Sequence, residues 1–411
     1  MFTNHRHMNS KKRVNQSINH VLPDRLPVDF LAVPEIWDAL VDHNEFEKQQ
    51  YDLNMALYDP NWERVNTSLQ NDCRILSYDQ FISPQPINFA EDWVVDWFGS
   101  PSRSTPNRMF RVKNGANSSM DVWGRVFSNH RENGITTENI LKSPLADCDD
   151  IKELRLKQWP SPEWWDFSTV ASLMNSIDPE NQYHWRYRAG SIFEIAWQLF
   201  GFEKLLMDLS LQPQLPLRAM EIITEITVEV LDIVLREHGD CIDTIYFYDD
   251  VATQENLLIS MKMWREFVKP FHQKIIDKAK LYQKTVMYHC DGNSRKIIPE
   301  LIDMGIDILN PIQADIPDMT PALLKAQFGK ELCFHGGVDI YRSLSNQFPM
   351  TIQQHVNTLK KEMLQNGGYI LAPTHHIQAR TPIDNILAMY NMNLREIKDD
   401  NSDRSFYGTC N

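Results

Sequence analysis

Short apolar runs alternate with amphipathic segments of helical spacing from about residue 216 to about residue 398. The apolar runs are continuous and rich in β-branched and aromatic residues, which is typical of parallel strands buried on both faces. The predicted strands are residues 242–248, 284–288, 306–312, 331–337 and 369–376. The helices that precede, separate and follow them are predicted at residues 218–239, 263–282, 294–305, 320–329, 351–368 and 381–398.

Local signals support several of these helix boundaries. Gly305 stands where a helix C-terminus takes a left-handed residue. Thr-Pro pairs at 320–321 and 381–382 match the N-cap and the first helical position. The pattern therefore consists of strand–helix units with defined ends.

Five such units in a row, without a glycine-rich dinucleotide motif, favour an α/β fold of the (β/α)8 TIM-barrel type over a doubly wound sheet. The three missing units must then come from the first half of the chain. Residues 90–99 and 184–209 are the candidates, and the second reads as a strand, a turn at Gly190 and a helix.

The domain prediction is one barrel domain over residues 18–398, with irregular N-terminal elaborations over 18–150. Residues 1–17 are predicted to be disordered or a frayed, polar and basic arm, and residues 399–411 a polar tail. A separate N-terminal domain of about 130 residues is the alternative.

Composition limits the classes of binding partner and the cellular compartment that we expect for this protein. The net charge of −14 argues against a nucleic-acid partner, because an acidic surface repels phosphate. No run approaches the roughly 18 apolar residues of a membrane span. Six scattered cysteines without CxxC spacing, and an N-terminus without an apolar signal segment, predict a cytoplasmic protein with reduced thiols.

Polar side chains gather where the predicted strands end. In a (β/α)8 barrel these C-terminal strand ends converge on the active site. The polar residues at the five strand ends are Asp249, Asp250, His289, Cys290, Asp291, Asn310, Gln313, His335, Asp339, His375 and His376. Gly336 and Gly337 allow either a close approach of backbone to a ligand or an ordinary tight turn.

His289 and Asp291 are two residues apart in an extended segment, so their side chains point to the same side and Cys290 points away. His375 or His376 joins them from a distant strand. Two imidazoles and one carboxylate suit zinc, iron(II) or another divalent metal with open coordination positions. Acid/base chemistry without a metal, or a hydrogen-bonded pair, is the alternative at this point.

Asp249 and Asp250 are adjacent, so only one of them can point into the site. The other is expected to cap a helix or to pair with a basic group. A nucleophilic serine is excluded because no GxSxG motif is present, and a phosphate-binding loop because no GxxxxGK[ST] motif is present.

The segments YDDVATQENLLISMKMWREFVKPF, HCDGNSRKIIPELIDMGIDILNPIQ, FHGGVD and GGYILAPTHHIQARTPIDNILAMY resemble the uroporphyrinogen decarboxylase superfamily. The resemblance covers about residues 18–398 and is strongest over 240–392. It implies a (β/α)8 barrel. It also implies one of two branches, the haem-pathway decarboxylase or the cobalamin-linked methyltransferases.

The decarboxylase branch carries an arginine-rich N-terminal segment that meets the substrate carboxylates, and this chain has none there, although His375 matches that branch's active-site histidine. The methyltransferase branch has a zinc site of His-x-Cys and a later cysteine. His289 matches the first ligand, while Asp291 and His375 stand in the two cysteine positions. The resemblance thus implies a metal on His289, Asp291 and His375.

The resulting expectation is a metal-dependent methyltransferase or demethylase, with zinc as the first choice of metal. Its methyl partner would be a corrinoid on a separate carrier protein, and the family suggests a homodimer. The expected catalytic residues are His289, Asp291, His375 and Asp250. The expected substrate-binding residues are Asp249, Gln254, Asn293, Gln313, His335, Asp339 and His376. The alternatives are a carboxy-lyase without metal and a barrel that binds a small molecule without turnover.

Overall fold

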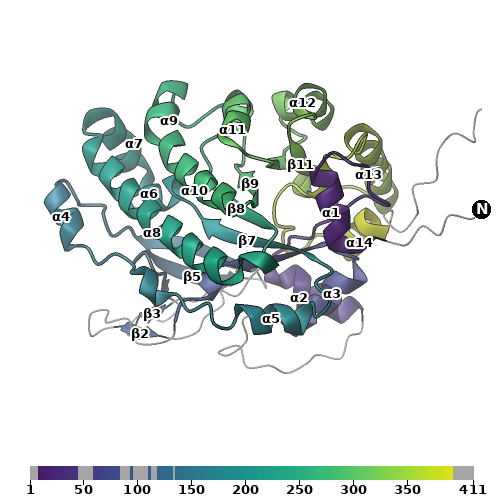
Figure 1. The fold of residues 1–411 in the computed structure, drawn as a ribbon, viewed down its shortest axis with the longest axis horizontal. Helices are drawn as coiled ribbons and strands as arrows, with labels where there is room; N and C mark the ends of the chain where they lie inside the picture. Colours follow the sequence, from purple (N-terminus) through teal and green to yellow (C-terminus); the bar gives the residue numbers. More distant parts are fainter. Residues whose placement is uncertain are drawn as a thin grey trace, which may run out of the picture.

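A computed structural model of the chain describes residues 8–44, 59–83, 93–95, 110–112, 118–132 and 135–391. Its centre is a parallel sheet whose outer face is covered by helices, and a smaller antiparallel sheet lies to one side (Figure 1). Among the described residues, no helix combines the length and apolar character that crossing a membrane requires.

The central sheet has seven strands, all parallel, and neighbours in the sheet follow one another along the chain. The strands are β1 (Cys73–Ser77), β7 (His184–Gly190), β8 (Thr244–Tyr248), β9 (Thr285–His289), β10 (Ile308–Ile312), β11 (Cys333–Val338) and β12 (Tyr369–Pro373). The five strands predicted after residue 240 are confirmed, and so is the strand, glycine turn and helix predicted at 184–209. Continuous burial on both faces explains why the sequence pattern identified them.

Helices follow the strands and pack on the outside of the sheet (Figure 1). They are α6 (Phe193–Phe200), α7 (Phe202–Leu211), α8 (Gln214–His238), α9 (Met261–Phe267), α10 (Lys269–Leu281), α11 (Ile298–Met304), α12 (Pro321–Phe328), α13 (Pro349–Met363) and α14 (Ile383–Asn391). The single helix predicted at 263–282 is wrong, because it breaks at Val268. Pro270 explains the break, since proline lacks an N–H and restricts the residue before it.

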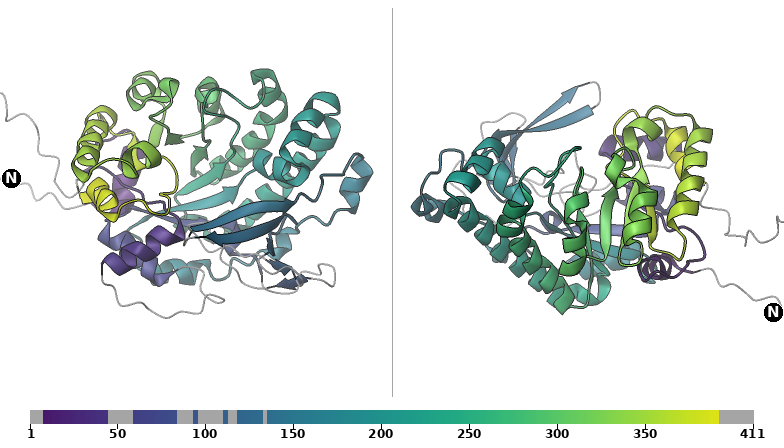
Figure 2. Two further views of the ribbon diagram at one scale, coloured as in Figure 1. Left: turned by 180° about the vertical axis from the view of Figure 1, so that it is seen from behind. Right: turned by 90° about the horizontal axis from the view of Figure 1, so that it is seen from above.

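The N-terminal region contributes further helices and a second sheet. The helices are α1 (Ser10–Ile18), α2 (Pro34–His43), α3 (Pro60–Ser68), α4 (Ile151–Leu156) and α5 (Val170–Ile177). The antiparallel strands are β2 (Trp93–Val95), β3 (Phe110–Val112), β4 (Ser118–Met120), β5 (Val126–Glu132) and β6 (Ile135–Lys142). Figure 2 shows these blue strands beside the teal and green strand–helix units.

Two expectations for the N-terminal half are corrected. The segment 90–99 was a candidate barrel unit, but Trp93–Val95 pairs antiparallel with β3. A parallel strand would have needed a long crossover to its neighbour, whereas an antiparallel one pairs with a nearby segment. The arm predicted for residues 1–17 is helical from residue 10, and Arg13 on this helix is buried. The predicted tail at 399–411 lies outside the described residues.

An extended segment around Val28 bonds to both edges of the parallel sheet. Val28 forms a parallel bridge with Leu371 in β12, and Asp29 N–H donates to the Leu371 carbonyl. On the other side, Asp72 N–H, directly before β1, donates to the Val28 carbonyl. The sheet edges are therefore joined at this seam by isolated hydrogen bonds, and a complete eight-stranded barrel stays a prediction.

A buried carboxylate holds the seam together. The side chain of Asp72 is fully buried and accepts hydrogen bonds from Arg13 and Arg25 and from the backbone N–H of Val28. Helix α1 reaches β12 independently, because the Ser17 hydroxyl donates to the Tyr369 carbonyl. These contacts fix the N-terminal segment against the strands on either side of the seam.

Asp72→Ala should lower the free energy of unfolding by about 3 kcal/mol, because it leaves the buried guanidinium of Arg13 and the half-buried one of Arg25 without their shared acceptor. Denaturant unfolding monitored by circular dichroism measures the loss. Glu221→Ala removes an exposed partner of Arg218 on α8 and should cost less than about 1 kcal/mol. Equal losses in the two variants would contradict this account of the seam.

A buried histidine should make the stability of the protein depend on pH. The ring of His184 contacts Thr244 Oγ1 at 2.8 Å and Asn15 Oδ1 at 3.0 Å, and burial lowers its pKa to about 4. In the unfolded chain a histidine titrates near pH 6.5. Protons therefore bind the unfolded chain first as the pH falls from about 6.5 to about 4, and the fold loses up to about 3 kcal/mol over this window.

His184→Gln should remove this part of the pH dependence, while His43→Gln, at an exposed position, should retain it. Unfolding curves at several pH values between about 4 and 7 test the difference. An unchanged pH dependence in His184→Gln would show that other groups cause it.

Candidate functional site

Adjacent strand ends bring the predicted polar residues together. Tyr248 pairs with His289 and His289 with Asn310, so the ends of β8, β9 and β10 lie side by side. Asp250 follows β8, and Asp291 lies two residues beyond the end of β9. The parallel register therefore places Asp250 beside His289, and Asp291 joins them from the segment that follows His289.

Three ligand atoms of this group could share one ion. His289 Nε2 lies 3.9 Å from Asp250 Oδ1 and 3.8 Å from Asp291 Oδ1, and the ligand atoms of the three residues all lie within 4.8 Å of one another. These gaps are too long for hydrogen bonds. Two ligands bound to one zinc ion at about 2.1 Å lie no more than roughly 4.2 Å apart, so the gaps fit a shared cation with little adjustment.

His375 lies next to this group. Its Nε2 is 3.8 Å from Asp291 Oδ2, and its ring centroid is 6.3 Å from that of His289. The sequence pattern and the family resemblance predict His375 as the third ligand, whereas the structure brings Asp250 into the compact group and leaves His375 beside Asp291. Which of the two would complete a metal site stays a prediction.

The charges of the group favour a cation. Burial lowers the pKa of His289, but Asp291 and Asp250 outweigh burial and hold this pKa above its usual value. Burial raises the pKa of Asp250, and Asp291 raises it further against the opposing effect of His289. Two carboxylates around one imidazole are thus short of positive charge, which a bound proton or a metal ion would supply.

A glutamine fixes the turn that carries Asp291. Gln313 Nε2 donates to Asp291 Oδ1 at 3.1 Å, and Gln313 Oε1 accepts from Gly292 N–H at 2.9 Å. Asp250 Oδ1 accepts from Asp291 N–H at 2.7 Å. Gly292 has φ +88°, and a Cβ there would lie 2.5 Å from the Thr253 carbonyl oxygen. The turn therefore requires glycine at this position.

The adjacent carboxylates have different surroundings, as their alternation predicted. Asp249 is fully buried and accepts hydrogen bonds from His272 and from three backbone N–H groups at the start of α6. All of these partners lie within the protein, and its predicted contact with a substrate stays a prediction. Cys290 also points away from the site, since its Sγ accepts from Val251 N–H.

The remaining predicted substrate-binding residues differ in exposure. His335 is buried between Asn310 and Asp29, and Asp339 caps the turn at Ile340–Leu344. Their predicted substrate contacts stay predictions. Gln254 is exposed, and Asn293 is half-buried. The His376 ring packs 5.0 Å from that of His375.

Three residues near the site were missed by the sequence analysis. The ring centroid of Tyr246 lies 6.1 Å from that of His289. Arg188 donates to Ser77 and Asp79, and its guanidinium lies 5.8 Å from the Tyr248 ring centroid. The rule that residues i and i+2 of a strand share one face pairs His289 with Asp291. Applied to β7 and β8, the same rule would have identified Arg188, Tyr246 and Tyr248.

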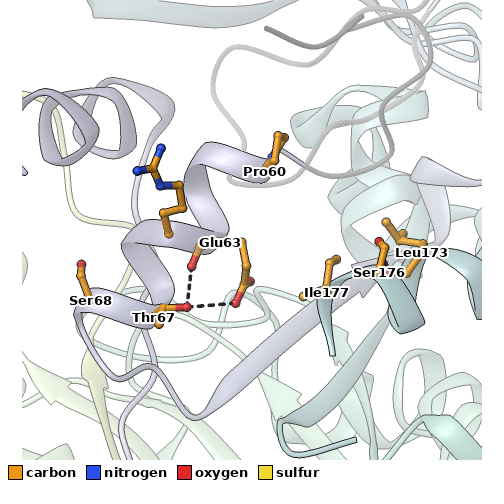
Figure 3. A pocket seen from close by; sticks show the side chains of 8 residues that line it. Pro60, Glu63, Thr67, Ser68, Leu173, Ser176 and Ile177 are labelled. Atoms are coloured by element: carbon orange, nitrogen blue, oxygen red, sulfur yellow. Dashed lines mark hydrogen bonds between the residues drawn. The ribbon is translucent and has the colours of Figure 1, made fainter. Parts of the chain in front are cut away.

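A surface hollow of about 600 Å³ lies elsewhere, between α3 and α5 (Figure 3). Thr67 in its wall donates to the carbonyl and the carboxylate of Glu63. Its described lining residues are Pro60, Glu63, Arg64, Thr67, Ser68, Leu173, Ser176 and Ile177. They include no histidine or cysteine, so the chemistry of the strand ends remains the better candidate site.

Comparison with solved structures supports the fold. A methyltransferase from Methanosarcina mazei has a TM-score of 0.64 and 16% sequence identity, and the match covers 94% of this chain and 98% of that one. A Xanthomonas albilineans dihydropteroate synthase, with a TM-score of 0.28 and 11% identity over 39% of this chain and 57% of that one, is too distant to support an argument. No curated protein sequence matches the chain significantly.

Residues 140–393 match the uroporphyrinogen decarboxylase (URO-D) family, and this range is more than half of the chain. It contains β7 to β12 and every residue of the candidate site. The chain therefore belongs to the uroporphyrinogen decarboxylase family.

Proposed function

We propose that this protein is a metal-dependent methyltransferase of the uroporphyrinogen decarboxylase family. The observation that carries the proposal is the group of Asp250, His289 and Asp291, whose ligand atoms lie within 4.8 Å of one another at adjacent strand ends. The similarity in fold to a methyltransferase from Methanosarcina mazei supports the choice of branch.

The donor set fits a divalent cation. One imidazole nitrogen and two carboxylate oxygens suit zinc first, and iron(II) or manganese as alternatives. His289 would bind through Nε2, and Asp250 and Asp291 through one oxygen each. His375, beside Asp291, is then free to act as a fourth ligand or as a base.

A bound divalent metal supplies Lewis acidity, which lowers the pKa of a bound thiol or polarises a bound oxygen or nitrogen. In the proposed reaction His375, half-exposed at the rim, accepts the proton of the acceptor thiol. Tyr246 and the paired Arg188 position the small substrate beside His289. A methyl-corrinoid on a separate carrier protein would supply the methyl group, and its cobalt would keep the electron pair of the broken cobalt–carbon bond as the carbon–sulfur bond forms.

Decarboxylation of a porphyrinogen is the weaker candidate. A substrate with many carboxylates needs several cationic partners, since an unpaired buried carboxylate is costly. The arginines near the described site are already paired, Arg186 with Asp29 and Arg188 with Asp79. These ion pairs favour a smaller and less acidic substrate.

His289→Ala should weaken zinc binding by at least about 100-fold and abolish methyl transfer, because it removes the only nitrogen of the compact three-residue group. Elemental analysis, chelator competition and methyl transfer from methylcobalamin to a thiol measure the effects. His43→Ala, at an exposed position outside the ligand group, is the control. Wild-type protein without stoichiometric metal, together with an active His289→Ala, would refute the proposal, and turnover of uroporphyrinogen would favour the lyase.

Gly292→Ala should destabilise the fold by about 1–3 kcal/mol and weaken zinc binding, because the added Cβ displaces the turn that carries Asp291. Gly239→Ala is the matched control, since the backbone there is helical and a Cβ would meet only Lys284 Cε at 3.8 Å. Unfolding curves and chelator competition measure both variants. Unchanged zinc affinity in Gly292→Ala would show that the turn does not set the ligand geometry.

A further inference from the structure

A chain of hydrogen bonds runs from His289 into the protein interior. His289 Nδ1 lies 2.5 Å from Asn310 Oδ1, and Asn310 Nδ2 lies 2.7 Å from His335 Nδ1. His335 Nε2 lies 2.8 Å from Asp29 Oδ2. Asn310, His335 and Asp29 are 3%, 0% and 1% exposed. Water is thus excluded from this hydrogen-bond chain beyond His289, so the polar groups of each member depend on protein partners for their hydrogen bonds.

The inner end of the chain has a fixed charge. Burial acts to raise the pKa of Asp29, but Arg186 and His335 outweigh it and hold this pKa well below its usual range. Arg186 pairs with Asp29 directly, and the backbone N–H of Phe30 donates to the second oxygen at 2.9 Å. Asp29 is therefore a carboxylate that only accepts hydrogen bonds.

This charge determines the direction of every bond in the chain. His335 Nε2 must carry the proton, because a lone pair 2.8 Å from a carboxylate would be repelled. Arg186 Nη1 also lies 3.3 Å from this nitrogen, but the shorter contact decides the tautomer. Burial lowers the pKa of His335, so the ring is neutral and its Nδ1 accepts a proton. Asn310 then donates through Nδ2 and accepts through Oδ1.

We infer that Asp29, His335 and Asn310 are positioning residues that hold His289 in the Nδ1–H tautomer, with the Nε2 lone pair directed at Asp250 and Asp291. The carboxylates alone would favour a proton on Nε2, where it would block a metal. The buried chain opposes this preference, because Asn310 Oδ1 accepts only from a protonated Nδ1. The use of the lone pair as a metal ligand rests on the proposed function, whereas the tautomer itself does not.

The tautomer can be measured without metal. In metal-free protein labelled with ¹⁵N-histidine, at a pH where both rings are neutral, NMR should show His289 protonated on Nδ1 and His335 on Nε2. His335→Phe removes the acceptor of Asn310 Nδ2, so the amide can turn over and the proton of His289 should move largely to Nε2. A wild-type His289 protonated on Nε2, or an unchanged tautomer in His335→Phe, would overturn the inference.

A second variant, Asn310→Asp, should give a different pattern of protonated ring nitrogens, and it tests the inference even if His335→Phe does not fold. Asn310→Asp keeps the acceptor for His289 but turns the donor toward His335 into another acceptor. His289 should therefore keep Nδ1–H, while His335 gains a proton on Nδ1. A change at His289 with none at His335 would contradict the inferred direction of the chain.

Zinc affinity supplies the readout for the metal. His335→Phe should bind zinc roughly 10–100-fold more weakly in chelator competition, although residue 335 does not touch the ligand group. Asn385→Asp is the control, because this buried amide on α14 bonds only to the carbonyls of Leu344 and Gln347 among the described contacts. It should change neither the affinity nor the tautomer. If wild type shows the expected tautomer but does not bind zinc, the proposed metal is refuted and the inferred hydrogen-bond chain stands. If His335→Phe changes the tautomer but not the zinc affinity, the proposed effect of the tautomer on zinc binding is refuted.

Discussion

The parallel register of β8, β9 and β10 is the constraint on which the site depends. Backbone hydrogen bonds align Tyr248 with His289 and His289 with Asn310. Residues more than 20 positions apart in sequence thereby become neighbours, and the carboxylates of Asp250 and Asp291 flank one imidazole. A shift of one residue would turn these side chains to the opposite face of the sheet.

The C-terminal half of the fold was predictable from sequence, because its strands are buried on both faces and its helices begin and end at residues such as Pro321 and Gly305. The N-terminal half was not. Helix α1 is polar, and its attachment depends on Arg13 meeting Asp72, which is 59 residues away. No local pattern encodes such a contact, although the break before Pro270 could have been read directly.

The site was predictable in part for the same reason. Alternation along one strand correctly paired His289 with Asp291 and separated Asp249 from Asp250. It could not say that Asp250 would complete the compact group or that His335 would face inward, because both depend on neighbouring strands. His335 contacts Asp29, which is 306 residues away and follows the residue that bridges to β12 at the seam.

Helix α1 covers the N-terminal ends of several strands of the parallel sheet. Val14 packs with Cys73, Ile308 and Cys333, the first residues of three strands, in a small apolar cluster. This apolar cluster hinders water and ions from entering between the N-terminal ends of these strands. Protons and small molecules that exchange with the polar interior of the molecule are then expected to enter at the opposite end, where they meet the more exposed side chains of His375 and Asp250 before that of His289.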